Sequence, residues 1–265
     1  MIPRVVSAID RARTEREQVS AERDAFDSFA ERIAALDTET QSSTTNLPSQ
    51  PATTPRAAGT MNQPTASETP EATDDATVAT VLQAYRDTVM AVSHYESEYG
   101  EPIEQNLAAE LSPEVAQLLK NNTVLTPQLQ AALLTETRQA SNQRNQFLTQ
   151  VDTEYDALVA ARRQLRDLRE TTTKIEEQLY PCPLREIIQS HERLETKANE
   201  CTTLLYDRQE RLHAAEQLTS VTSLQNYLYQ SFEWEYPVLN DGLDTLSRIC
   251  HAKRRAVRAI YNWGN

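Results

Sequence analysis

The fold of this 265-residue chain is decided by residues 147–215, which read FLTQVDTEYDALVAARRQLRDLRETTTKIEEQLYPCPLREIIQSHERLETKANECTTLLYDRQERLHAA. Apolar residues recur at alternating steps of four and three on both sides of the turn Pro181-Cys182-Pro183. This spacing keeps them on one face of a helix, whereas the two prolines remove backbone donors and end it. We therefore predict two long helices, about 127–180 and 183–218, that pair as an antiparallel coiled-coil hairpin.

The two apolar stripes also contain polar residues, which allow the pairing register to be predicted. When leucines face leucines, the numbers of facing residues add to 362 or 363, and Glu154 then faces Arg208 while Thr172 faces His191. A slipped register would leave each charge against apolar side chains, which is costly. We interpret these four residues as register residues, with His191 hydrogen-bonded to the facing threonine. A metal ligand and a pH switch are the alternative interpretations of this histidine.

The rest of the chain predicts shorter helices and one long interruption. Residues 38–77 contain five of the twelve prolines, eleven threonines and almost no large apolar side chains. Such a segment buries too little surface to offset its ordering entropy, so we predict a disordered linker. An N-terminal amphipathic helix is expected in residues 1–37, and a helical body that contains the hairpin in residues 78–265. Strand-like alternation is missing, so the predicted fold is all-α, with shorter helices packed on the hairpin.

The shorter helices are predicted from their apolar spacing and their caps. The first helix carries an apolar stripe interrupted by Arg16 and Arg23. We expect it to dock on the body or on a second copy, because a long apolar face is costly to expose. A second helix is expected over residues 78–99. Ser112-Pro113 and Thr126-Pro127 have the cap-plus-proline pattern typical of helix starts.

The composition excludes several classes of protein. The four glycines are far apart, so no glycine-rich loop can hold a nucleotide phosphate. Apolar runs stay far below the ~20 residues that cross a bilayer, and no apolar leader opens the chain. The three cysteines form neither a disulfide framework nor a metal motif. We expect a cytoplasmic protein without a membrane span, with reduced, buried cysteines.

The charge of the chain is strongly negative. Aspartate and glutamate total 39 against 26 lysines and arginines, which gives a net charge of −13, and only four of the basic residues are lysines. An acidic surface stays solvated and self-repelling. We interpret this balance as salt adaptation. A GC-rich genome with an ordinary solvated helical surface is the alternative.

Few residues are candidates for chemistry. Glu210-x-x-His213 is half of the motif that binds iron in helical bundles, but no second Glu-x-x-His exists. We therefore expect a solvated pair at this position. The sequence offers no nucleophile–base pair, metal cluster or cofactor loop, and we predict no catalytic residue, metal or cofactor.

The last helix of the chain is the candidate partner surface. Its apolar face is expected to contain Leu239, Leu243, Leu246, Ile249, Val257 and Ile260. Its possible partner surface consists of Arg248, Lys253, Arg254, Arg255, Arg258 and Trp263. These cations could pair with acidic residues of the same chain or of a protein partner, or they could bind nucleic acid.

The C-terminal residues resemble a known family. Tyr227-Leu228-Tyr229, Pro237-Val238-Leu239 and Arg255-Ala256-Val257-Arg258 are similar to the closing part of an uncharacterised haloarchaeal family, domain of unknown function 7260. Ile9-Asp10-Arg11-Ala12 is similar to the first helix of that family. The resemblance implies a helical fold and a haloarchaeal origin, and it brings no activity, cofactor or catalytic residue.

These observations favour a non-enzymatic helical scaffold or protein-interaction protein, with a protein partner or self-association. The alternative is a nucleic-acid-associated regulator that uses the basic C-terminal helix. Loss of nucleic-acid binding on removal of residues 248–265 would favour the regulator, whereas loss of stability or of a protein partner would favour the scaffold.

Overall fold

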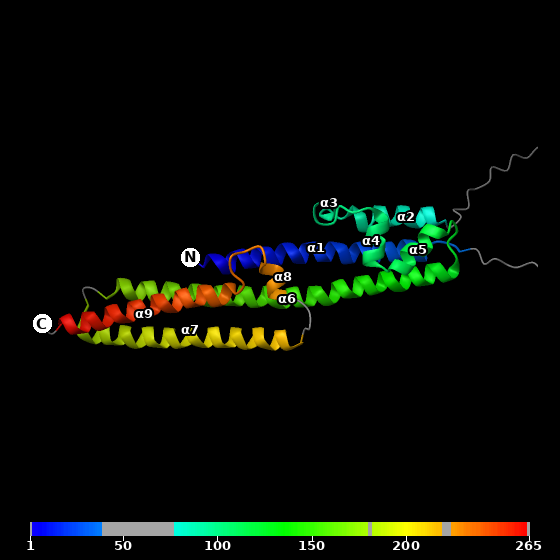
Figure 1. Cartoon of the computed structure of the whole chain (residues 1–265). Coiled ribbons are helices and arrows are strands. Elements are labelled where there is room, and N and C mark those ends of the chain that lie inside the picture. The colour runs from blue at the N-terminus through cyan, green and yellow to red at the C-terminus, as the bar shows by residue number, and fades with distance from the viewer. Residues whose placement is uncertain (1, 39–76, 180–181, 219–223, 264–265) are drawn as a thin grey trace, which may run out of the picture. The chain divides into compact units, whose positions relative to one another are not determined.

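A computed structural model describes residues 2–38, 77–179, 182–218 and 224–263 (Figure 1). Regular structure in these ranges is helical, apart from one isolated bridge between Thr77 and Val124. The all-α prediction is thereby confirmed. The predicted linker, residues 38–77, lies almost wholly outside the described residues.

The described helices match the predicted order closely. They are α1 (Pro3–Ala34), α2 (Val78–Asp87), the short 3₁₀ helix η1 (Val89–Ala91), α3 (Tyr95–Glu98), α4 (Ile103–Glu110), α5 (Pro113–Asn121), α6 (Pro127–Glu177), α7 (Leu184–Leu218), α8 (Leu224–Tyr229) and α9 (Pro237–Trp263). Both predicted proline starts are confirmed, because Ser112 Oγ and Thr126 Oγ1 accept hydrogen bonds from backbone amides in the first turns of α5 and α6.

The prediction of a single helix over residues 78–99 is wrong, since this segment forms α2, η1 and α3. The break begins at Thr88, whose hydroxyl donates to Ala84 O at 2.7 Å. The Thr88 amide bonds instead to Tyr85 O, and Val92 is extended. The Thr88 hydroxyl thus bonds to Ala84 O, the carbonyl to which the Thr88 amide would bond if the α-helix continued. Gly100, at φ 55°, then ends α3 in a conformation that favours glycine.

The described chain divides into two compact units. One consists of residues 1–20 with 145–265, and the other of residues 21–144. Helices α1 and α6 each contribute residues to both units. The expected parts 1–37, 38–77 and 78–265 stay a prediction, since residues 39–76 lie outside the described residues.

In the first unit, α6 and α7 form the predicted long antiparallel pair (Figure 1). Lys197 Nζ of α7 lies 3.9 Å from Asp167 Oδ2 of α6. Arg208 of α7 contacts Glu154 of α6 nearer the other end. The residue numbers of these ion pairs add to 364 and 362, so the first lies within one residue of the predicted sums of 362 and 363 and the second equals one of them.

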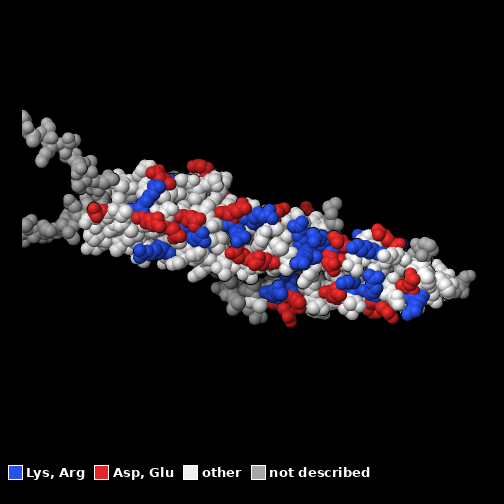
Figure 2. Space-filling model, turned by 180° about the vertical axis from the view of Figure 1, so that it is seen from behind, with Lys and Arg blue, Asp and Glu red and all other residues white. Residues whose placement is uncertain are grey.

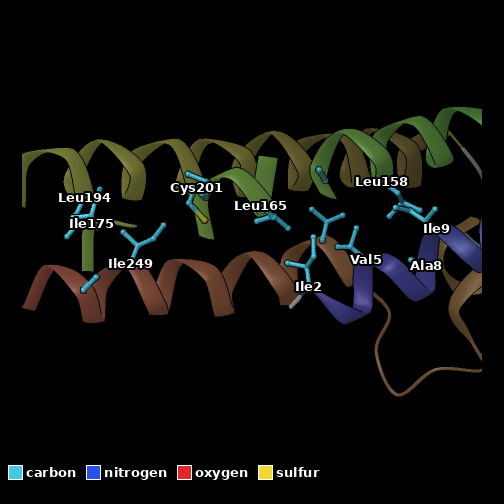
Figure 3. Close-up of a cluster of buried hydrophobic side chains, with 14 of the residues drawn as sticks. Ile2, Val5, Ala8, Ile9, Leu158, Leu165, Ile175, Leu194, Cys201 and Ile249 are labelled. Carbon is cyan, nitrogen blue, oxygen red and sulfur yellow. The ribbon is translucent and has the colours of Figure 1, made fainter. Parts of the chain in front are cut away.

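A third long helix, α9, packs along this pair and shares its core. Its buried side is made largely of small residues: Gly242, Thr245, Ala252, Ala256 and Ala259. They allow α7 to approach closely, and a Cβ added at Gly242 would lie 2.5 Å from Leu205 Cδ2. Figure 3 shows Ile249 of α9 beside Ile175 and Leu194 of the helix pair. The apolar seam of the hairpin is therefore packed between three helices, α6, α7 and α9.

The first part of α1 completes this core. Ile2, Val5, Ala8, Ile9 and Ala12 are buried in it (Figure 3), in line with the expectation that this helix docks on the body.

Near the middle of α1, the neighbouring residues Glu15 and Arg16 differ in burial. Arg16, one of the two arginines that interrupt the apolar stripe, is 51% exposed and pairs with Asp152 at 2.7 Å, while Glu15 is buried against Arg11 and Tyr227. The buried carboxylate is tolerated because it is paired with Arg11 and accepts a hydrogen bond from Tyr227.

The second unit has its own core. Phe26, Phe29 and Ile33 of α1 pack against residues of α2, α4, α5 and the first part of α6. Phe29 meets Tyr85 of α2 edge to face, with ring centroids 5.1 Å apart. Aromatic pairs in this geometry add stability beyond their buried area.

The first turn of α1 is capped by a carboxylate of a helix that is far away in the sequence. Pro3 opens α1, and its first turn has no acidic residue of its own. Asp241 of α9 fills this role, because its Oδ2 accepts the Val5 amide at 2.9 Å and its Oδ1 accepts from Arg4 Nη1 at 3.1 Å. Asp244 also binds Arg4, at 2.7 Å, but is largely exposed.

We predict that Asp241→Ala lowers the free energy of unfolding by about 2 kcal/mol, because it removes the cap of α1. Asp244→Ala is the matched control and should cost less than about 0.5 kcal/mol, as an exposed ion pair. Chemical denaturation followed by circular dichroism measures both. Equal losses for the two variants would contradict the capping role.

Candidate functional site

The predicted charge pair of the hairpin is buried and doubly hydrogen-bonded. Arg208 Nη1 donates to Glu154 Oε2 at 3.0 Å, and Nη2 donates to Oε1 at 2.6 Å. The hydroxyl of Tyr229, in α8, adds a third bond to Glu154 Oε1 at 2.8 Å. Burial raises the pKa of the Tyr229 hydroxyl above its usual value, and the Glu154 carboxylate raises it further. The three side chains are thus joined to one another by hydrogen bonds.

The second predicted pair does not form the expected hydrogen bond. The Thr172 hydroxyl is buried and donates to Leu168 O of its own helix at 2.7 Å. His191 is half-buried on α7. Glu195, one turn further along α7, pairs with Lys253 of α9. Residues four apart share a helix face, so His191 lies on the face of α7 that meets α9, a helix that the pairwise register did not include.

Three of the predicted partner-surface cations are engaged within the chain. Arg255 Nη1 lies 3.3 Å from Glu176 Oε1 of α6, and Arg248 Nη2 lies 4.0 Å from Oε2 of the same carboxylate. Lys253 Nζ lies 3.3 Å from Glu195 Oε1 of α7. These contacts tie α9 to both helices of the hairpin. They match the interpretation in which the cations pair with acidic residues of the same chain.

The remaining predicted residues face solvent. Arg254 donates from Nε to Cys250 O at 3.4 Å, and neither it nor Arg258 has an ion-pair partner in the described part of the chain. Trp263, near the end of α9, is exposed. Figure 2 shows acidic residues interleaved with the basic ones over the face of the molecule that it draws.

A shallow apolar groove lies between α7 and α9 in the first unit. It encloses roughly 310 Å³. Its walls are formed by Thr202, Leu205, Tyr206, Gln209, Leu239 and Leu243. Tyr206 is 65% exposed and Leu243 57% exposed, so the groove is open to solvent. Large apolar side chains gathered in an open groove are typical of a surface that contacts another macromolecule.

The sequence analysis missed this groove because it assigned one apolar face to α9. That assignment is wrong for Leu243 and Val257, which are exposed, whereas Ile249 is buried in the core. The buried side follows the small residues from Gly242 to Ala259, which also recur at steps of three and four. This small-residue repeat is the signal that could have separated the core side from the outer side.

The second unit contains a buried polar cluster that the sequence analysis did not find. Arg144 of α6 donates to Glu22 of α1 at 3.2 Å and to Glu110 of α4 at 2.5 Å. His94 Nε2 lies 2.9 Å from Glu22 Oε1, and the Tyr99 hydroxyl donates to the same oxygen at 3.0 Å. Burial raises the pKa of the Glu110 carboxyl, an effect that Arg144 opposes. Each of these five groups has a partner within the cluster, which joins α1, α4 and α6.

The described residues hold no group of three or more histidine, cysteine, aspartate or glutamate side chains that could share one metal ion. Glu210 and His213 of the half-motif are both exposed. Among the described helices, none is both long enough and apolar enough to cross a bilayer.

The described chain is thus an all-α protein in which a basic third helix packs on a long antiparallel pair. The model of the family described as "Domain of unknown function (DUF7260)" matches residues 4–253, so the chain belongs to this family. A search of the curated proteins found no match. A search of the solved structures found none either.

We predict that Glu154→Leu or Arg208→Leu alone lowers the free energy of unfolding by about 3–5 kcal/mol, because each leaves a buried charge unpaired. The double replacement should cost far less. All three variants are compared in a Tyr229→Phe background, so that no phenol is left without its carboxylate. Denaturant unfolding measures the differences, and a double variant as unstable as the sum of the singles would contradict the pairing role.

Alkaline pH is predicted to unfold the protein through its buried tyrosines. Burial raises the pKa of Tyr85 and Tyr229 in the folded chain, while an unfolded tyrosine ionises near pH 10. Their stabilisation is therefore complete below about pH 10 and is lost as the pH rises above it. Tyrosinate absorbance should show both ionising only together with loss of helical circular dichroism. Ionisation of both tyrosines in a fully helical chain would contradict this prediction.

Proposed function

We propose that this protein is a non-enzymatic helical scaffold or protein-interaction protein, and that its binding surface is the α7–α9 groove. The observation that carries the proposal is the exposure of a large apolar side chain on each wall, Tyr206 on α7 and Leu243 on α9. Exposing such residues is unfavourable unless another surface covers them. The buried polar residues of both units are already joined in structural bonds, and this supports a non-catalytic role.

We further propose that the protein works in the salt-rich cytoplasm of a haloarchaeon. The support is compositional: 39 acidic residues against 26 basic ones, of which four are lysines. Concentrated salt screens ionic attraction between exposed groups and strengthens apolar association. An apolar groove is therefore a better binding surface under such conditions than a patch of charges.

A second candidate function is nucleic-acid binding through the outer side of α9. The observation in its favour is that Arg254 and Arg258 have no ion-pair partner in the described part of the chain and lie near exposed Tyr261 and Trp263. Three other cations of this helix already pair with carboxylates, which leaves a small basic surface on an acidic protein.

The test is affinity purification of the tagged full-length chain from its source cells at native salt, with chemical cross-linking before lysis. We expect protein cross-links that map to α7 and α9, and we expect Leu243→Glu to abolish them. Val159→Glu on α6 is the matched control, since Val159 is also exposed, at 41%, but lies outside the groove. Cross-links unaffected by Leu243→Glu would contradict the proposed surface.

Nucleic-acid binding is tested in parallel with Arg254→Gln/Arg258→Gln. Binding to duplex DNA that this double variant abolishes, and that Leu243→Glu leaves intact, would favour the second candidate function. We expect that neither the wild-type chain nor these variants bind duplex DNA specifically at native salt.

A further inference from the structure

The outer side of α9 carries an apolar stripe whose spacing is symmetric about Cys250. The stripe consists of Leu239, Leu243, Leu246, Cys250, Val257 and Tyr261. With Arg254 included, the steps between its members are four, three and four on each side of Cys250. On a helix with 3.6 residues per turn these positions form one nearly straight line.

This stripe lies on the solvent side of the first unit, next to α7. Leu243, Val257 and Tyr261 are exposed, and Leu239, Leu246 and Cys250 are half-buried, with Leu246 at the edge of the stripe also packed against the core. The inner side of α9 faces the core through Thr245 and Ile249, so the stripe is a second apolar face of the same helix. The groove at Leu239 and Leu243 is the part of this face where α7 forms the opposite wall.

A symmetric stripe is suited to contact with itself. In a two-fold interface, residue i of one copy meets residue j of the other, and residue j meets residue i. Two antiparallel α9 helices centred on Cys250 would place Leu243 against Val257 of the partner subunit and Leu239 against Tyr261 of the partner subunit. Leu246 would lie under Arg254 of the partner subunit, whose methylene stem can cover a leucine while its charge stays in water.

We propose that the occupant of this face is a second copy of the chain, bound through α9 in an antiparallel two-fold dimer with Cys250 at the axis. This inference rests on the proposed function, because it names the partner of the same surface. The protein is then its own partner, and the α7 wall of each copy faces the α7 wall of the other.

The available area is sufficient for a stable dimer only if α7 takes part. The stripe from Leu239 to Tyr261 is about 33 Å long at 1.5 Å per residue. A strip one helix wide along it would bury only about 330 Å² per copy, or about 660 Å² in total. Including the adjacent α7 wall doubles the width and gives about 1,300 Å², which lies within the range of specific interfaces. The exposed Tyr206 and Ile188 of α7 supply apolar surface on that wall.

The first experiment exchanges charges across the proposed axis. Leu243→Glu alone and Val257→Lys alone should each convert the full-length protein from dimer to monomer in sedimentation velocity. The double variant L243E/V257K should regain the dimer, because each glutamate faces a lysine of the other copy. Positions 243 and 257 lie about 21 Å apart within one helix, so a pair within one chain cannot explain the recovery. Val159→Glu is the control and should remain dimeric.

The second experiment uses the cysteine at the axis. In a chain with Cys182→Ser and Cys201→Ala, diamide should link Cys250 to Cys250 of the partner subunit and give a covalent dimer on a non-reducing gel. The reverse variant, with Cys182 as the one remaining cysteine, should give little dimer. The runs use the lowest salt at which circular dichroism shows the wild-type helix content, so that the exchanged charges remain effective.

The outcomes separate this inference from the proposed function. A monomeric wild-type chain, or a double variant that stays monomeric while helical, overturns the α9 dimer. If cross-linking from cells still places a different protein on α7 and α9, and Leu243→Glu removes it, the interaction function stands without self-association. If the dimer forms through α9 and cells give no other partner on this face, the surface serves assembly of the chain alone.

Discussion

Two charges buried on facing helices, Glu154 of α6 and Arg208 of α7, allow few registers between the two longest helices of the chain. Each is surrounded by apolar layers, so a shift of one turn would leave both without a partner at a cost of several kcal/mol. Tyr229 binds the same carboxylate and thereby attaches α8 to the pair. We propose that these residues fix the register, after which the other contacts of the first unit can form.

Packing of α9 is the main consequence of that register. Its small residues fit against α7 where Cys201 lies 3.5 Å from Gly242 O, and Arg169 of α6 donates to Thr245 at 2.7 Å. The same helix supplies Asp241, which caps α1 from a distant part of the chain. Because small residues take many of its core positions, α9 leaves Leu243 and Val257 on the outside. The groove therefore follows from the way in which α9 packs.

Sequence reasoning found the parts of the candidate site but not their arrangement. The Glu154–Arg208 contact could be predicted because both residues interrupt stripes whose register can be counted. Pairing of Arg255 with Glu176 could be predicted only as a class of contact, since many carboxylates were available. The exposure of Leu243 was not predicted, because leucine usually marks the buried face and the repeat of smaller residues beside it was not used. The cluster around Arg144 joins residues separated by up to 122 positions, and no local pattern reports such contacts.

The sequence by itself determined the helical class, the length and antiparallel order of the two long helices, and their register. These properties depend on apolar spacing, proline positions and a pair of charges, all of which can be counted along the chain. Only the tertiary structure decided which helix fills the third side of the hairpin, which carboxylate caps α1, and which apolar face of α9 is exposed to solvent. The physical reason is that these choices depend on side-chain volume and on partners distant in sequence. More than one arrangement of the helices satisfies the same periodic pattern of residues.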